Sequence, residues 1–496
     1  MTMSKIRGMH GFLASSIGVT CAAALALPLT PPAAAANLPA TAAVLSARSP
    51  AVSTPAKATA RPAATAEATG STQSLLLVPL TQDRAGGLPP EQGLTRRDVR
   101  PFSLVGVVWD DPDVELHGQV QVRTREAGTG TWSGWQHLET HNSDHAADPD
   151  SAERTSGRVR GATAPLWVGG SDGVEVRVRA DAEPRAVRVE ETARGPRTAT
   201  AAVPLPTGMR LELVDPGAPD DPPRAAPADA AGAPRADIPT AEPAQALAAT
   251  DASAANTDLA PLGATEIPSL TRDETERQLF TPRTTELAEG QRVKPKIGPR
   301  PRIVTRRGWG ANESLRERTF VYTKKVKAAF VHHTASGNGY RCAQAPSVIR
   351  GIYRYHVLSM GWRDIGYNFL VDKCGNIYEG RAGGAAKPVM GAHTLGFNTN
   401  SMGIAVLGSF GTKKPSAAAV KALARLTAWK LGLYGANPRG KTYLKSGGGN
   451  LYPKGKKVRL NVISGHRDGF STACPGYRLY RKLGTTRSTA ARYQGR

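Results

Sequence analysis

Large apolar side chains are nearly absent from two long stretches of this 496-residue chain. Residues 37–73 and 216–265 consist mainly of Ala, Pro, Thr, Ser and Asp, which cannot bury enough apolar surface to form a core. We therefore expect disorder over 37–73, and an Ala/Pro-rich linker with a polar lead-in over 216–300. After the first 36 residues no apolar run approaches the length of a membrane span, so no stable membrane insertion is expected.

The N-terminus has the order of an export signal. Basic residues precede an apolar stretch from about residue 12 to residue 29, and three alanines, 34–36, follow. This order predicts a cleaved signal peptide over 1–36 and a protein that is secreted or acts at the cell wall. An uncleaved anchor helix is one alternative, although Pro28 interrupts a stretch that is short for a bilayer. Lipidation at Cys21 is another, although the residues before it lack the usual leucine.

Cysteine occurs only four times. Cys21 would leave with the signal, so an exported chain would keep an odd number, namely Cys342, Cys374 and Cys474. Cysteines outside the reducing cytoplasm are normally paired, so one of these three needs another role.

Acidic residues are scarce in the last part of the chain. From Pro301 onward six Asp and Glu stand against 34 Lys and Arg, so the net charge of +23 belongs to this part. An exported protein meets phosphate-rich wall polymers rather than DNA, so we expect attraction to anionic wall polymers and no nucleic-acid partner. Solubility alone is the alternative explanation of the charge.

An all-β domain of unknown role is predicted over 74–215. Apolar and polar residues alternate there with period two, which is typical of half-buried antiparallel strands, and turn residues separate the strands. The alternating segments are 103–109, 118–124, 174–179, 187–190 and 209–214. They favour a small β-sandwich. Trp132 and Trp135 could stack on sugars, but capping of the sandwich core is the preferred interpretation.

The last domain, over 301–485, mixes strand and helix periods and predicts a mixed sheet covered by helices. Strands are expected at 326–332, 367–371, 377–381 and 402–407, and helices at 346–360, 415–433 and 475–483. The Gly- and Lys-rich residues 435–457 predict an exposed loop or hairpin, and 486–496 a basic tail. The predicted fold class is therefore multidomain: an N-terminal all-β sandwich-like domain, a disordered linker and a C-terminal α/β domain.

Three motifs in this domain carry chemistry. An apolar strand ends in His332-His333-Thr334, Tyr367 follows a glycine, and His466 precedes Cys474 by eight residues. Such histidines and a cysteine are typical metal ligands. Because adjacent residues of a strand point to opposite faces, His332 and His333 cannot both reach one metal easily. Over 303–483 these motifs resemble the peptidoglycan recognition proteins and phage-lysozyme-like type 2 zinc amidases, which cleave between N-acetylmuramic acid and L-alanine.

The resemblance implies a role for each residue. It makes His332, His466 and Cys474 the ligands of Zn²⁺ and Tyr367 the catalytic phenol that stabilises an oxyanion or positions water. It also implies that the Thr472 hydroxyl could assist, since phage members carry a catalytic lysine there, and that His393 binds substrate.

If Cys474 binds metal, Cys342 and Cys374 are left to form a disulfide. The alternative pairs Cys374 with Cys474 and leaves Cys342 free. His356 is expected to be a core histidine, and Glu379 to form a salt bridge with Arg381 or Arg363.

The expected activity is that of a secreted zinc amidase acting on bacterial peptidoglycan. The expected partners are peptidoglycan and anionic wall polymers, and the protein is expected to be a monomer. A non-catalytic peptidoglycan-binding module is one alternative, although such relatives usually lack the ligand cysteine. A zinc endopeptidase acting within stem peptides is the other, because the same chemistry does not fix which amide is cut.

Overall fold

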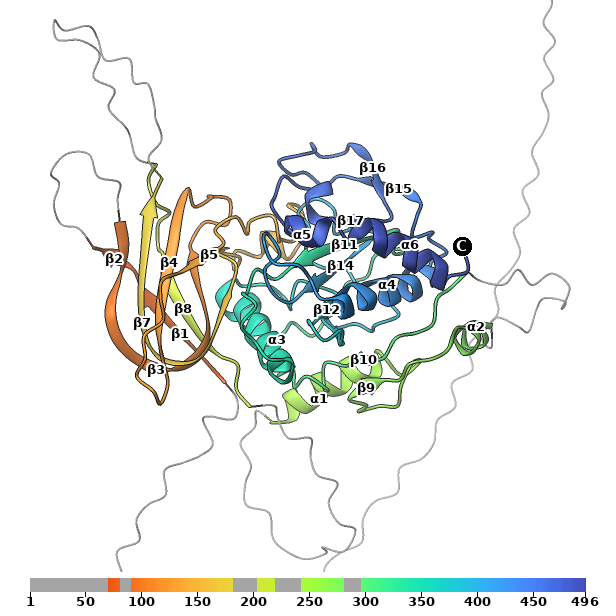
Figure 1. Ribbon diagram of the computed structural model, residues 1–496, viewed down its shortest axis with the longest axis horizontal. Coiled ribbons are helices and arrows are strands. Elements are labelled where there is room, and N and C mark those ends of the chain that lie inside the picture. The colour runs from red at the N-terminus through yellow and green to blue at the C-terminus, as the bar shows by residue number, and fades with distance from the viewer. Residues whose placement is uncertain (1–69, 81–90, 182–202, 219–241, 281–295) are drawn as a thin grey trace, which may run out of the picture. The chain divides into compact units, whose positions relative to one another are not determined.

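The computed structural model describes residues 70–80, 91–181, 203–218, 242–280 and 296–496 (Figure 1). The predicted signal peptide, most of 37–73 and the strand expected at 187–190 lie outside the described residues. The rest forms an antiparallel sheet followed by a mixed sheet with helices, as the predicted fold class requires. None of the helices in the described ranges is long and apolar enough to cross a membrane.

The N-terminal sheet has eight strands, and all its pairings are antiparallel. The strands are β1 (Ser71–Leu76), β2 (Val78–Pro79), β3 (Glu91–Trp109), β4 (Gly118–Glu126), β5 (Gln136–Leu138), β6 (Gly161–Ala162), β7 (Leu166–Ala180) and β8 (Arg210–Asp215). The path through the sheet runs β1-β8-β3-β7-β4-β5, while β2 and β6 pair with β3.

Register shifts bend the long strand β3, which is strongly curved in Figure 1. They lie between Leu94 and Leu104. Extra residues of β3 oppose β7 at the first two shifts, and extra residues of β7 oppose β3 at the third. Both halves of β3 therefore contribute to one core with β4, β7 and β8. Trp132 and Trp135 do not cap this core. Both rings lie against the Arg123 guanidinium, at 5.8 and 4.8 Å, so the preferred interpretation of these residues is wrong.

The second sheet has seven strands in the order β17-β11-β14-β12-β13-β10-β9. They are β9 (Glu266–Ile267), β10 (Ile303–Val304), β11 (Ala328–His333), β12 (Phe369–Val371), β13 (Ile377–Glu379), β14 (Ser401–Val406) and β17 (Ile463–Gly465). The helices are α1 (Glu242–Ala254), α2 (Arg272–Phe280), α3 (Ala345–Arg354), α4 (Ala417–Gly432), α5 (Tyr477–Tyr480) and α6 (Leu483–Tyr493). Parallel pairing of β17, β11, β14 and β12 makes the centre of this sheet parallel.

Helices cover both faces of this centre, which explains why its strands are apolar on both sides. On one face, α3 packs Ile349 and Ile352 against Leu370 of β12. On the other face, α4 and α6 pack against Ile404 of β14 and its neighbours. The chain beyond α3 continues as a π-helical turn, Tyr355–Ser359, within the predicted helix 346–360.

The predicted linker and tail contain ordered structure. Within 216–300, α1, β9 and α2 form, and α1 buries Ala248 and Ala252. Arg316 Nη2 donates to the Ala248 carbonyl at 3.0 Å, which fixes α1 to the α/β domain. Alanine favours helix and packs closely, so a shortage of large side chains did not prevent order here. The expected basic tail is largely α6, whose Ala490 and Ala491 are buried.

Two further features frame the domain. The Gly- and Lys-rich region forms an antiparallel hairpin of β15 (Lys441–Lys445) and β16 (Lys457–Asn461). Cys342, just before α3, is joined by a disulfide to Cys374 in the β12–β13 turn. Cys474 is therefore the one free cysteine among the described residues.

Candidate active site

The three predicted ligands meet at one edge of the mixed sheet. His332 lies near the end of β11, and His466 directly follows β17, which runs parallel to β11. The Nδ1 atoms of the two histidines are 3.1 Å apart, and Cys474 Sγ lies 3.8 Å from His332 Nδ1. Parallel strands thus bring together residues that are far apart in sequence.

A fourth side chain, which the sequence analysis missed, joins them from the N-terminal domain. His145 lies between β5 and β6, and its Nε2 atom is 3.5 Å from Cys474 Sγ. One ligating atom from each of His145, His332, His466 and Cys474 lies within 4.8 Å of the others, and all four residues are buried. In the sequence, the only sign of a metal-binding role for this residue is the aspartate that directly precedes it in a polar segment.

The separations suit zinc. Tetrahedral Zn²⁺ with ordinary bond lengths holds two ligating nitrogens about 3.3 Å apart, and a nitrogen and a sulfur about 3.6 Å apart. The observed 3.1 Å between nitrogens and 3.5 and 3.8 Å between nitrogen and sulfur are close to these values. Three imidazoles and a thiol are also a donor set that zinc prefers.

Burial sets the protonation of the predicted ligands. It lowers the pKa of His466 to about 3 and the pKa of His332 well below its ordinary value, so both imidazoles are neutral at pH 7. Neutral imidazole is the form that binds metal. Burial raises the pKa of the Cys474 thiol, so a bound cation would be needed to hold the thiolate. Burial lowers the pKa of His145, but nearby groups, chiefly the negative charge of Asp144, together outweigh it and raise this pKa well above its ordinary value. A metal ion and a proton would therefore compete for this imidazole.

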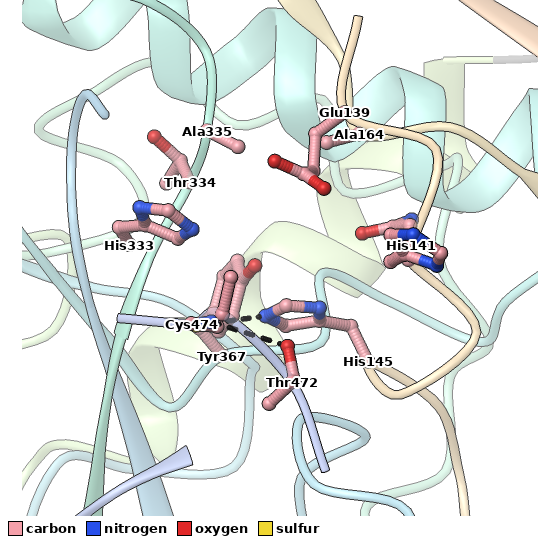
Figure 2. Close-up of a pocket in the computed structure, with 12 residues that line it drawn as sticks. Glu139, His141, His145, Ala164, His333, Thr334, Ala335, Tyr367, Thr472 and Cys474 are labelled. Carbon is pink, nitrogen blue, oxygen red and sulfur yellow. Dashed lines mark hydrogen bonds between the residues drawn. The ribbon is translucent and has the colours of Figure 1, made fainter. Parts of the chain in front are cut away.

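Tyr367 lies beside the four side chains. Its ring centroid is 5.5 Å from that of His332 and 6.0 Å from that of His145. Burial raises the pKa of Tyr367 to about 12, so the phenol is protonated at neutral pH. Thr472 Oγ1 accepts a hydrogen bond from the Cys474 amide at 3.1 Å, which fixes the backbone of that predicted ligand (Figure 2).

His393 does not line the pocket where the resemblance placed a substrate-binding residue. It is fully buried, with its ring 5.2 Å from that of His332, and a Cβ at Gly403 would lie only 2.3 Å from it. Its Nδ1 atom is 3.0 Å from Thr394 Oγ1, which in turn is 3.3 Å from His332 Nε2. His393 therefore supports the orientation of His332 rather than facing solvent.

His333 is not part of the ligand cluster, which agrees with the alternation of side chains along a strand. It forms one wall of a small pocket, and its Nδ1 atom accepts a hydrogen bond from the Phe410 amide at 3.4 Å. Glu139, His141 and His145 form the opposite side of this pocket (Figure 2). The room left between the two sides is about 10 Å³, roughly that of one water molecule.

The predicted salt bridge of Glu379 with Arg381 or Arg363 is wrong. Asn256 Nδ2 donates to both Glu379 carboxylate oxygens, at 2.8 and 2.9 Å. Arg381 pairs instead with Glu153, and Arg363 with Glu317. His356 is a buried histidine whose Nδ1 accepts from the Gly366 amide at 3.2 Å, as a core histidine should.

Two family models match the chain. Residues 322–477 match the N-acetylmuramoyl-L-alanine amidase family. This range includes the three predicted ligands and Tyr367. Residues 48–203 match the family described as the Rv3811 N-terminal galactose-binding domain-like region. This range includes His145.

Curated and solved proteins are similar to the second half of the chain. Peptidoglycan-recognition protein SC2 of Drosophila simulans is 30% identical over 183 residues, which are 37% of this chain and 85% of the relative. The solved Drosophila PGRP-LB is 25% identical over 37% of this chain and 92% of its own, with a TM-score of 0.30. An endolysin N-acetylmuramoyl-L-alanine amidase from Clostridium intestinale is 21% identical over 38% and 95%, with a TM-score of 0.26. The extent of the match to the recognition proteins confirms the resemblance of the motifs: the chain belongs to the family of peptidoglycan-recognition proteins and type 2 N-acetylmuramoyl-L-alanine amidases.

Proposed function

We propose that the chain is a zinc-dependent peptidoglycan hydrolase that cleaves the amide between N-acetylmuramic acid and L-alanine of the stem peptide. The observation that carries the proposal is the convergence of His332, His466 and Cys474 beside Tyr367. The family membership supports the substrate class, since relatives are named for recognition of peptidoglycan or for this amidase activity.

The chemistry divides between the metal and the protein. Zinc with three protein ligands and one open position lowers the pKa of bound water to about 7 and polarises a carbonyl. His332, His466 and Cys474 would hold it, with Thr394 and His393 orienting His332 from behind. The protonated Tyr367 phenol would donate a hydrogen bond to the carbonyl oxygen as negative charge develops on it. Thr472 would act through the Cys474 backbone rather than as a proton donor.

Attraction to anionic wall polymers is the second part of the proposal. One face of the β15–β16 hairpin exposes Lys441, Lys445, Lys457 and Arg459. Lys445 and Lys457 stand directly opposite each other, and like charges in such a pair destabilise a sheet. A phosphate-rich partner would relieve this repulsion, so the hairpin is the surface that we assign to wall polymers.

The proposed place of action is outside the cytoplasm, in the cell wall, and the proposed state is a monomer. The Cys342–Cys374 disulfide supports export, because such bonds persist in oxidising compartments. The signal-like order of residues 1–36 supports it independently.

The test combines metal content with product analysis. The full-length chain and its Cys474→Ser variant are loaded with zinc, their bound metal is measured, and each is incubated with purified peptidoglycan. We expect one zinc per wild-type chain and slow release of intact stem peptides with a free L-alanine amino group, detected by mass spectrometry. The variant should lose the activity and bind zinc more weakly than the wild type. Severed cross-links instead would indicate an endopeptidase, and peptidoglycan binding with no products would indicate a recognition module.

A further inference from the structure

We propose that His145 is a fourth ligand of the metal, and that residues 139–160, here called the covering segment, close the active site and hold the enzyme latent. The term latent rests on the function proposed above, whereas the ligand assignment does not. The covering segment connects β5 to β6 of the N-terminal domain and includes the short helical turn Arg154–Ser156.

The geometry of His145 is that of a ligand. Its Nε2 atom faces Cys474 Sγ at 3.5 Å, and its ring centroid is 4.5 Å from that of His466. Its other nitrogen, Nδ1, lies 2.8 Å from Asp144 Oδ1. A carboxylate on the second nitrogen is the arrangement that fixes the tautomer and orientation of metal-binding histidines. The Leu395 amide donates to the Asp144 carbonyl at 2.9 Å, which holds this pair against the α/β domain.

A fourth protein ligand has a definite chemical consequence. Catalytic zinc sites keep three protein ligands and one open position, whereas sites with four protein ligands are closed. His145 would occupy the position that water or the substrate carbonyl needs. The covering segment also fills the approach to Tyr367, because the remaining room is only about that of one water molecule. A muramoyl peptide cannot enter until the segment withdraws.

Among the contacts that anchor the covering segment away from the ligands, two are made by carboxylates that accept several hydrogen bonds each. Asp148 Oδ1 accepts hydrogen bonds from the Gly396 amide at 2.9 Å and from Asn398 Nδ2 at 2.8 Å. Glu153 and Arg381 form a two-bond ion pair, each bond 2.8 Å long, with both side chains less than a tenth exposed. The segment is therefore seated by polar contacts along a path that includes the metal position.

The first test asks whether the metal has an open position. Full-length wild type, His145→Ala and the control His141→Ala are loaded with Co²⁺, and their visible spectra are recorded with increasing azide. His141 is exposed and lies on the same segment, so its variant controls for loss of a nearby imidazole. We expect azide to change the spectrum of His145→Ala only. Zinc transfer from this variant to a chelator should be at least about tenfold faster than from the other two proteins.

The second test asks whether closure causes latency. Zinc-loaded His145→Ala should release stem peptides from peptidoglycan at least tenfold faster than wild type and His141→Ala. An azide response in wild type equal to that of His145→Ala would overturn the ligand assignment. An azide response confined to His145→Ala, with no peptide release by any protein, would uphold the ligand and reject the amidase function.

A variant that touches no ligand covers the case in which His145→Ala does not fold. Asp148→Asn combined with Glu153→Gln removes charge from both anchors and leaves His145 and Asp144 in place. This double variant should gain an azide response and faster peptide release. If it folds and shows the closed spectrum and the slow release of wild type, the covering segment does not control the site.

Discussion

The buried ion pair between Glu153 and Arg381 gives the sharpest quantitative prediction. Glu153 belongs to the covering segment and Arg381 to the α/β domain, and they are joined by two hydrogen bonds of 2.8 Å. The Arg363 amide also donates to Glu153, at 3.2 Å. Although burial opposes ionisation of Glu153, the charge of Arg381 outweighs it and lowers the pKa of the carboxyl group. The pair is therefore charged at neutral pH.

Glu153→Gln leaves the Arg381 charge buried without its counter-ion. Breaking a buried pair from one side costs about 3–5 kcal/mol. Arg381 keeps hydrogen bonds to the carbonyls of Ile365 and Asp364, so we expect the lower end, about 3 kcal/mol. If the loss falls on docking of the covering segment, its open fraction rises by a factor of about 150.

Hydrogen exchange followed by mass spectrometry measures this fraction directly. The Ser151 and Thr155 amides bond within the segment, and the Arg160 amide bonds to the Met360 carbonyl, so peptides covering them report its opening. The matched control is Asp150→Asn, which breaks an exposed ion pair with Lys454 and should cost no more than about 1 kcal/mol. Faster exchange in the segment, with that of β11 unchanged, is the expected result. Equal exchange in the two variants would refute the anchoring role of Glu153.

Three further predictions concern stability and binding. Burial raises the pKa of Glu379 from 4.5 to about 7, so its contribution to stability is full below pH 4.5 and is lost as pH rises through 7. The unfolding free energy of the wild type should therefore fall by about 3 kcal/mol more between pH 4.5 and pH 8.5 than that of Glu379→Gln. Identical pH profiles of the two proteins in urea unfolding would contradict this. Replacing Cys342 and Cys374 by Ala opens a link across 32 residues and should lower the unfolding free energy by about 3–4 kcal/mol, whereas an unchanged urea midpoint would argue against the disulfide. Lys445→Gln with Lys457→Gln should weaken binding to poly(glycerol phosphate) most at low salt, and an unaltered salt dependence would place the attraction elsewhere.

Local patterns accounted for much of the α/β domain. The apolar run before His332 predicted β11, and helix periodicity predicted α3 and α4 to within a few residues. The resemblance selected His332, His466 and Cys474. The structure brings the two histidines together because β11 and β17 are parallel neighbours, and Cys474 joins them from the chain that follows β17. Those signals are local, and the long-range step follows from ordinary sheet pairing.

Features that depend on docking between distant segments were not predictable in the same way. His145 lies in a polar segment with no strand or helix periodicity, and its role is indicated by its contacts with Cys474, His466 and Asp144 in the folded structure. His393 was assigned by resemblance to the groove, yet the absence of a side chain at Gly403 lets it pack inside. Helix α1 was read as linker because composition measures large apolar side chains and not the close packing of alanine.

Product analysis with a paired set of variants tests the central claim most directly. Zinc-loaded His145→Ala and the double variant His145→Ala/Cys474→Ser are incubated with purified peptidoglycan, and released peptides are identified by mass spectrometry. The account predicts intact stem peptides with a free L-alanine amino group from the single variant only. Equal release by both variants, or release by neither, would contradict catalysis by a metal held at His332, His466 and Cys474.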